Sequence, residues 1–240
     1  MKIYLLLAVI AYAFAASGYA TRYWDCCKPS CSWTGNAGAG NEARECDYKS
    51  MNVLNGHGAT SVCDGGNSAT CISQVPQVVS SNLAYAFAAA PGNGPNVCGK
   101  CFELKFTGTG KYETQENHRR LVGKRLIVMA SNIGYDVAGG QFDVMIPGGG
   151  VGIFNGCREI MSTAGAQYGG LLSDCESQAG YSGDVYGARK SCLIQKCKDN
   201  FPNATLQQGC LFLAEWMEAA GNPNVEYTEV ACPSALKDRY

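Results

Sequence analysis

Fourteen cysteines limit how this 240-residue chain can fold more than any other feature. The first of them is Cys26, so all follow the apolar N-terminal stretch, and their number is even. An even count in a secreted chain indicates a disulfide framework, here of up to seven bridges. Zinc is the competing use of cysteine, but Cys98 and Cys101 form the only Cys-x-x-Cys pair, and His57 and His118 lie far apart in the sequence. We therefore expect disulfide-stapled loops, no metal, and two solvated histidines.

The N-terminus has the pattern of a secretory signal peptide. Lys2 precedes an apolar run from Ile3 to Ala16, and small residues follow it. The run is shorter than the roughly 20 apolar residues that cross a bilayer, which argues against a membrane anchor. We expect residues 1–20 to be removed, with cleavage somewhere between residues 15 and 20, and the protein to be secreted into the extracellular space.

Residues 21–240 are expected to form a single domain. Their number is sufficient for one hydrophobic core, and neither an internal repeat nor a Ser/Thr/Pro-rich linker divides them. The formal net charge is -1, so electrostatics give no reason to expect nucleic acid or a membrane surface as a partner. Asn203 begins an Asn-Ala-Thr triplet, which is a glycosylation acceptor pattern.

Alternating apolar residues predict several short strands. Residues 101–106 and 141–146 have this pattern, and in the second of them Phe142 and Val144 would face the core while Asp143 faces the other way. Residues 126–130 form a short apolar run, which is consistent with a buried strand. Scattered glycines indicate many turns and long loops between the strands. The sequence therefore predicts a mainly β fold, a closed barrel with a few peripheral helices.

Two segments are predicted to be helical. One begins near Pro76, continues through Val78, Leu83 and Phe87, and ends before Pro91. The other covers residues 206–220 and ends at Gly221, and its Trp216 is expected to pack in the core.

The first chemical motif surrounds Asp25. Tyr23 and Trp24 precede this carboxylate, and Cys26, Cys27 and Cys31 follow it. Rings that stack on sugars beside a carboxylate fixed by disulfides suit a glycoside-cleaving site. A surface aspartate in a disulfide knot is the alternative, and the spacing alone favours that alternative.

The second motif joins two acidic residues to a glycine-rich loop. Asp136 and Asp143 precede the segment 146–152, whose glycines let the backbone pass close to a neighbour. A phosphate-binding loop is disfavoured because no Gly-Lys-Ser/Thr ending follows. Glycosidases use one protonated and one ionised carboxyl group, and Asp25 and Asp143 are the candidates for that pair.

Together the two motifs closely resemble the signatures of glycoside hydrolase family 45, the small inverting endoglucanases. The first signature is present as Thr21-Arg22-Tyr23-Trp24-Asp25, with Cys31 six residues after the aspartate. The second is present as Phe142-Asp143 leading into Ile146 to Phe154. Weaker similarity extends over nearly the whole chain after the leader.

The resemblance implies a six-stranded double-psi β-barrel, a groove for a β-1,4-glucan chain, and a single catalytic domain without a separate carbohydrate-binding module. Asp25 would be the general base, Asp143 the general acid, and Asp136 would assist the acid from a flexible loop. The acid is expected to stay protonated through burial or a neighbouring carboxylate. Inversion requires the two carboxyl groups to lie roughly 6.5–9.5 Å apart. The positions expected to bind sugar are Thr21, Tyr23, Lys28, Trp33, Gly148, Gly149 and Tyr168.

The cysteine pairing is likewise implied by the family. It gives Cys26–Cys157, Cys27–Cys63, Cys31–Cys98, Cys46–Cys71, Cys101–Cys232 and Cys197–Cys210, which leaves Cys175–Cys192. Gln141 departs from fungal members, which have a histidine there, and residues 171–196 resemble an insertion.

The resemblance therefore implies a secreted, monomeric, cofactor-independent enzyme that cleaves internal β-1,4 bonds of cellulose or amorphous glucan with inversion. One alternative is the same chemistry on xyloglucan or glucomannan. Another is a non-hydrolytic, expansin-like protein that binds polysaccharide, but expansins lack the base that Asp25 would supply.

Overall fold

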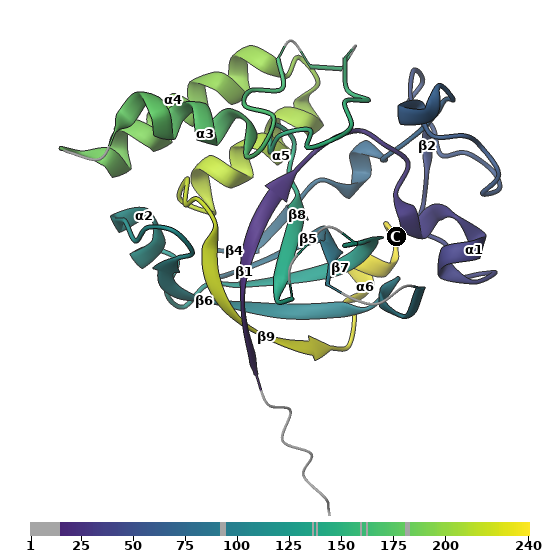
Figure 1. Ribbon diagram of the computed structural model, residues 1–240, viewed down its shortest axis with the longest axis horizontal. Helices are drawn as coiled ribbons and strands as arrows, with labels where there is room; N and C mark the ends of the chain where they lie inside the picture. The colour runs from purple at the N-terminus through teal and green to yellow at the C-terminus, as the bar shows by residue number, and fades with distance from the viewer. Residues whose placement is uncertain are drawn as a thin grey trace, which may run out of the picture.

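The computed structural model describes residues 15–91, 95–135, 137, 139–158, 160–161, 163–180 and 183–240, and Figure 1 shows their arrangement. Most of the expected leader lies outside the described residues. The strands are β1 Ala16–Tyr23, β2 Cys46–Asp47, β3 Ser68–Ala69, β4 Gln77–Ser80, β5 Leu83–Ala90, β6 Cys101–Gly110, β7 Arg125–Ile133, β8 Gln141–Met145 and β9 Pro223–Val230. The helices are α1 Thr34–Ala37, α2 Glu116–Arg119, α3 Gly170–Ala179, α4 Val185–Asn200, α5 Ala204–Glu215 and α6 Ser234–Lys237.

The main sheet closes on itself. Its strand order is β4-β5-β7-β6-β9-β1-β8, and β8 pairs again with β5, so six strands form a ring and β4 lies outside it. The pairs β1–β8 and β5–β7 are parallel, whereas β6 is antiparallel to both β7 and β9. A closed ring of six strands is consistent with the expected barrel, and its double-psi connection stays a prediction.

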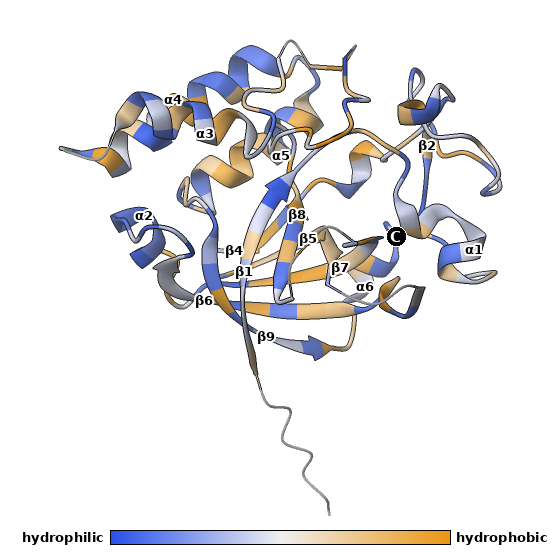
Figure 2. Cartoon of the chain, viewed as in Figure 1, coloured by the Kyte–Doolittle hydropathy of each residue, from blue (hydrophilic) through white to orange (hydrophobic). Residues whose placement is uncertain are grey.

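The three predicted strands are confirmed as β6, β7 and β8. In β8 the predicted alternation holds, since Phe142 and Val144 are fully buried and Asp143 between them is only partly buried. Figure 2 shows hydrophobic residues along β5, β6 and β7, which enclose the core. The alternating pattern therefore sets which side of β8 carries the acidic side chain.

The predicted helix that begins near Pro76 is wrong, because this segment forms β4 and β5. Its run of alanines and its apolar spacing favour a helix locally. In the structure, however, β5 lies between β4, β7 and β8, and Ala84, Ala86, Phe87 and Ala88 are all fully buried. A strand covered on both faces reads as a continuous apolar run, and the tertiary pairing outweighs the helical propensity.

Three helices gather on one side of the ring (Figure 1). The predicted C-terminal helix is present as α5, which begins at Ala204, two residues earlier than expected, and ends at Glu215. The side chain of Asn203 caps α5, since its oxygen accepts hydrogen bonds from the amides of Thr205 and Leu206. The expected insertion forms α3 and α4, and the Cys175–Cys192 disulfide joins them.

The seven disulfides join the same cysteine pairs that the family resemblance implies, and none of the fourteen cysteines is free. The Cys26–Cys157 and Cys101–Cys232 bridges each span 131 residues of sequence. A disulfide that closes a long loop stabilises a fold more than one that closes a short loop, because it restricts the unfolded chain more.

Candidate active site

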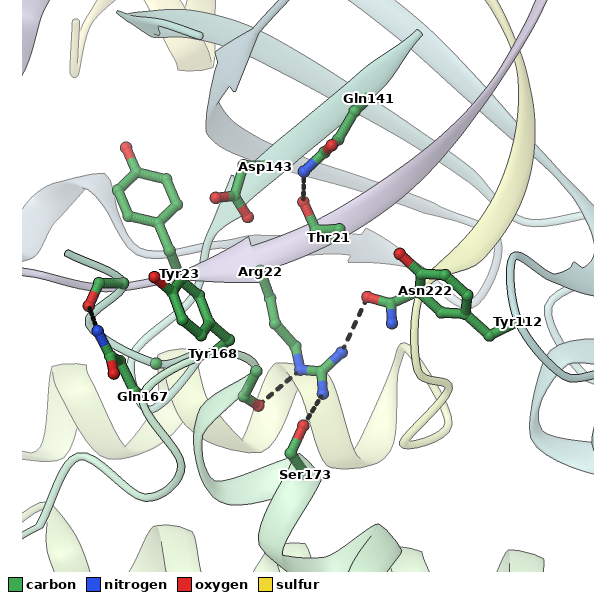
Figure 3. Close-up of a pocket in the computed structure, with 13 residues that line it drawn as sticks. Thr21, Arg22, Tyr23, Tyr112, Gln141, Asp143, Gln167, Tyr168, Ser173 and Asn222 are labelled. Carbon is green, nitrogen blue, oxygen red and sulfur yellow. Dashed lines mark hydrogen bonds between the residues drawn. The ribbon is translucent and has the colours of Figure 1, made fainter. Parts of the chain in front are cut away.

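Two hollows meet at Asp143 and form one groove. The first, here called the Asp25 hollow, has a volume of about 390 Å³ and contains both Asp25 and Asp143 in its lining. The second, the Tyr168 hollow, has a volume of about 330 Å³ (Figure 3). Tyr23, Asp143 and Gly152 line both hollows. The two aspartates chosen from the sequence motifs are thus brought to the same cavity.

Asp25 lies immediately beyond the end of β1, where the backbone is held firmly. The amide of Cys27 donates a hydrogen bond of 2.9 Å to Asp25 Oδ1, and the amide of Gly156 donates one of 2.9 Å to the Asp25 carbonyl. The adjacent Cys26 is in the left-handed region with φ 62° and forms a disulfide with Cys157. The carboxylate is therefore fixed between β1 and the segment that follows the glycine-rich loop.

Asp143 is positioned by two strands at once. In the parallel pairing it lies opposite Thr21 of β1, and on its other side it pairs with Ala89 of β5. Its residue is partly buried, and its Oδ1 atom is shielded from solvent. The carboxyl group of Asp143 therefore faces the groove from a strand that is paired on both sides.

Three polar side chains connect β1 and β8 beside Asp143. The hydroxyl of Tyr19 donates to Gln141 Oε1 at 2.7 Å, and Gln141 Nε2 donates to Thr21 Oγ1 at 3.0 Å. Burial, with smaller contributions from Tyr112 and Asp143, raises the pKa of the Tyr19 hydroxyl. Gln141 thus hydrogen-bonds to β1 through both its amide oxygen and its amide nitrogen.

Arg22 points to the opposite side of β1 from Asp143, as Figure 3 shows. Its Nε donates to the Gly169 carbonyl at 3.0 Å, its Nη2 donates to Ser173 Oγ at 3.1 Å, and its Nη1 lies 3.5 Å from Asn222 Oδ1. Burial lowers the pKa of this guanidinium, and Glu176 opposes that effect. Arg22 therefore holds the Tyr168 loop and Asn222 against β1.

Tyr23 is fixed through Asn132 of β7. Asn132 donates its amide to the Tyr23 hydroxyl and accepts from the Ser30 amide. Because Tyr23 lines both hollows, this network sets the position of a ring at the junction of the groove.

The glycine-rich loop packs against the protein more than against the groove. A Cβ at Gly149 would lie 2.8 Å from the Tyr23 amide nitrogen, and one at Gly148 would lie 2.9 Å from Leu171 Cδ1. Neither residue lines a hollow, whereas Gly150 and Gly152 do. The glycines thus let the loop approach β1 and the start of α3 closely.

The ammonium of Lys28 is buried and packs against the ring of Trp33. The Lys28 ammonium lies 2.6 Å from Glu45 Oε2, both side chains are fully buried, and the ammonium also donates to the His57 and Ala59 carbonyls. It lies 3.5 Å from the centroid of the Trp33 ring. Lys28 lines the Asp25 hollow, and its ammonium is bound by protein groups. Asp136, the predicted assistant of the acid, lies outside the described residues.

Sequence reasoning missed several residues that line the groove. Asn222, Gln167 and Tyr112 line the Tyr168 hollow, and Ile153 and Phe154 line the Asp25 hollow. The signal that would have found some of them is exposure of large apolar side chains, because an exposed cluster of this kind marks a binding surface. The exposed large apolar residues along the groove are Tyr112, Tyr135, Ile153, Phe154 and Tyr168.

His118 was expected to be solvated and is instead completely buried, so that expectation is wrong. Across the described part of the chain, no group of three or more His, Cys, Asp and Glu side chains is arranged to hold a metal ion. Within the same residues, every helix is too short or too polar to cross a membrane. Asn203 is exposed and therefore accessible for glycosylation, which stays a prediction.

Known proteins resemble this chain in sequence and in fold. It is 43% identical over 231 residues to "Endoglucanase B" of Cellvibrio japonicus (strain Ueda107), covering 93% of this chain and 45% of the relative. It is 39% identical to the "Putative endoglucanase type K" of Fusarium oxysporum, covering 99% of this chain and 57% of the relative. The chain thus spans about half the length of these two relatives.

The likeness to a solved structure covers nearly all of both chains. The crystal structure of a cellulase from the Antarctic springtail, Cryptopygus antarcticus, has a TM-score of 0.73 and 34% identity, over 94% of this chain and 96% of that one. The sequence model described as Glycosyl hydrolase family 45 matches residues 17–240. With these relatives, that match shows that the chain belongs to glycosyl hydrolase family 45.

Proposed function

We propose that this protein is a secreted endo-β-1,4-glucanase that hydrolyses cellulose or amorphous glucan with inversion at the anomeric carbon. The observation that carries the proposal is that Asp25 and Asp143 line one hollow, which continues past Asp143 into a second one. A polymer can extend in both directions from a junction of this kind, so its internal bonds are within reach. The names of the relatives, endoglucanase and cellulase, support the same substrate class.

In the proposed reaction Asp143 is the general acid and Asp25 the general base. Asp143 transfers its proton to the glycosidic oxygen as the bond to the anomeric carbon breaks. Asp25 accepts a proton from a water molecule, whose oxygen attacks the anomeric carbon from the opposite face of the ring. The products are two shorter chains, one of which has an inverted anomeric hydroxyl. Asp143 has lost one proton and Asp25 has gained one, so the reaction balances.

The surroundings of the two carboxyl groups favour this division of roles. Asp25 accepts an amide hydrogen bond from Cys27, and an accepted hydrogen bond favours the ionised form that a base requires. One oxygen of Asp143 is shielded from solvent, and burial disfavours the charged form, as an acid requires. Asp136 is proposed to assist the acid, as in the family.

The sugar-binding residues are proposed to be those that reach the groove. Thr21, Tyr23 and Tyr168 do so, and residue Tyr168 is 69% exposed. Lys28 also lines the Asp25 hollow, but it is proposed to act indirectly together with Trp33, because its ammonium contacts Glu45, two backbone carbonyls and the Trp33 ring. Gly148 and Gly149 are proposed to act through the shape of the glycine-rich loop, because their close packing places Gly150 and Gly152 in the lining of the groove.

Secretion is supported by seven disulfides and by the start of β1. Ala16 to Tyr19 pair with β9, so cleavage after Ala15 keeps the strand whole, whereas cleavage after Ala20 removes its first five residues. We therefore place the cleavage after Ala15. N-terminal sequencing of the secreted protein tests this, and a mature chain that begins at Thr21 would contradict it. A monomer with a double-psi barrel, without cofactor, is proposed on the family resemblance.

A polymer panel tests the proposed function. Carboxymethyl-cellulose, xyloglucan and glucomannan are each incubated with the enzyme, and viscosity and new reducing ends are measured together. An endo-acting enzyme lowers viscosity early, when few ends have appeared, and proton NMR of the first products shows the inverted anomer. Preference for xyloglucan or glucomannan would reassign the substrate. Binding without new ends on any polymer would support an expansin-like protein instead.

A further inference from the structure

The groove continues beyond the Tyr168 hollow into a third cavity. This cavity, here called the distal hollow, has a volume of about 350 Å³ and is lined by Tyr112, Glu113, Glu176, Gly221 and Asn222. Tyr112 and Asn222 also line the Tyr168 hollow, so the two cavities share a wall. Figure 3 shows Tyr112 and Asn222 at the end of the groove away from Gln167.

Tyr112 is exposed although the backbone on either side of it is pinned. Its residue is 78% accessible to solvent. The backbone amide of Lys111 donates to the Asn222 carbonyl at 2.9 Å, and the side-chain Nδ2 of Asn224 donates to the Gly110 carbonyl at 3.0 Å. Arg189 donates to Glu113 Oε1 at 2.8 Å. A large ring held in water by a fixed backbone is a preorganised surface for stacking, because little conformational entropy is lost when a ligand binds it.

Buried His118 joins the two segments that line the distal hollow. Its Nδ1 accepts a hydrogen bond of 3.0 Å from the Gln115 amide, so the proton lies on Nε2, which donates to the Gly221 carbonyl at 2.7 Å. The loop that carries Tyr112 and the turn that carries Asn222 are thereby held as one unit. Asn222 itself has φ 48°, a left-handed conformation that asparagine tolerates and that is found more often at functional sites than elsewhere.

The polar groups of the distal hollow suit sugar hydroxyls. Burial alone would raise the pKa of Glu113, but hydrogen bonds from Arg189 and Gln115 hold it below its usual 4.5, so the carboxylate remains an acceptor. Glu176 lies 3.8 Å from Arg189 and 3.7 Å from Arg22. Asn222 directs its oxygen to Arg22 and so offers its amide nitrogen as a donor. Two acceptors, one donor and a ring make a site for a neutral polyhydroxylated ligand.

We infer that the distal hollow is an additional subsite, in which Tyr112 stacks against a glucosyl unit of the substrate chain beyond the unit held at Tyr168. The inference rests on the proposed glucanase function, since it takes the ligand to be the same polymer. Its consequence is selectivity for chain length: only an oligosaccharide long enough to pass both Tyr168 and Asn222 while lying across Asp143 gains from the Tyr112 contact.

The test compares the longest and the shortest cello-oligosaccharides that the enzyme cleaves. The variants are Tyr112→Ala, Tyr112→Phe and Val122→Ala, the last an exposed apolar residue that does not line the described hollows. Tyr112→Ala is expected to raise KM for the longest substrate roughly tenfold, equivalent to about 1.4 kcal/mol, with little change in kcat or in KM for the shortest. Tyr112→Phe keeps the ring and is expected to behave nearly as wild type, as is Val122→Ala.

Calorimetric binding of cellohexaose to an Asp143→Asn background separates this inference from the proposed function. If wild type cleaves glucan but Tyr112→Ala leaves the ratio of KM values unchanged, the distal subsite is overturned and the glucanase stands. If nothing is cleaved but cellohexaose binds and Tyr112→Ala weakens it, the subsite holds and the hydrolytic function is overturned. Absence of both cleavage and binding overturns both.

Discussion

Thr21 lies directly opposite Asp143 in the parallel pairing of β1 with β8. This register brings two motifs that are distant in the sequence onto one wall of the groove. It also directs Arg22 to the opposite side of β1 from Asp143, where its guanidinium holds Gly169 and Ser173 in the wall of the Tyr168 hollow. A shift of one residue in this pairing would exchange the two faces, so the site depends on the register of two strands.

Replacing Thr21 with valine tests the hydrogen bond that Gln141 donates across this wall. Valine keeps the β-branched shape but leaves Gln141 Nε2 without its acceptor, which costs about 1–3 kcal/mol when the group is shielded from water. We expect kcat/KM on a soluble glucan to fall roughly tenfold. Thr107→Val, on an exposed part of β6, is the matched control and should leave it unchanged. Equal activity of the two variants would show that the bond does not position the groove wall.

Removal of two disulfides at different places in the fold should have different effects on stability and on activity. Cys26–Cys157 joins the residue after Asp25 to the end of the glycine-rich loop, whereas Cys175–Cys192 joins only α3 and α4. Removing the first pair as alanines is expected to lower the free energy of unfolding by about 4–5 kcal/mol, and removing the second by about 3 kcal/mol. Denaturant titration measures both. Activity under native conditions should fall for the first double variant only, and equal losses would contradict the assigned role of Cys26.

Glu218 makes the stability of the protein dependent on pH. Burial alone would raise its pKa, but hydrogen bonds from Lys124, Lys190 and Tyr186 outweigh this and hold the pKa below its usual 4.5. A carboxyl group with a lowered pKa in the folded state stabilises the fold above the unfolded-state value, and this contribution is lost as the pH falls through the folded-state value.

We therefore expect Glu218→Gln to lower Tm at about pH 7 and to differ less from wild type at about pH 3, because the stabilising contribution of the carboxylate is lost as the pH falls through its folded-state pKa. Glu116→Gln is the control, since its pairing with Arg120 is half-exposed and contributes little. Thermal unfolding at both pH values gives the comparison. A difference for Glu218→Gln that is as large in acid as at neutral pH would contradict the ionic origin of the effect.

The sequence predicts those elements whose pattern and tertiary environment agree. In β8 the alternation of Phe142, Asp143 and Val144 identifies both the strand and the side that carries the acid. In β5 the local pattern and the tertiary environment disagree. Its run of alanines has helical propensity, but pairing with the neighbouring strands makes the segment a strand. No local pattern reveals that pairing.

The site was predictable where a motif carries the chemistry and not where the fold assembles it. Asp25 and Asp143 are marked by their surroundings in the sequence and by the family resemblance. Tyr112 is one of many tyrosines until the loop that carries it is placed beside Asn222. Lys28 lines the Asp25 hollow, as its motif suggests, but only the fold shows that its ammonium is buried against Glu45.

The most direct test of the central claim is the hydrolysis of two substrates by Asp25→Asn and Asp143→Asn, with exposed Asp64→Asn as control. On carboxymethyl-cellulose each of the first two should lose about 10²–10⁴-fold in kcat, and Asp64→Asn should lose nothing. On an aryl cello-oligosaccharide whose phenolate leaves without protonation, Asp143→Asn should recover most of its rate and Asp25→Asn should not. Recovery of Asp25→Asn instead, or full activity of either variant on the polymer, would contradict the assignment of Asp143 as acid and Asp25 as base.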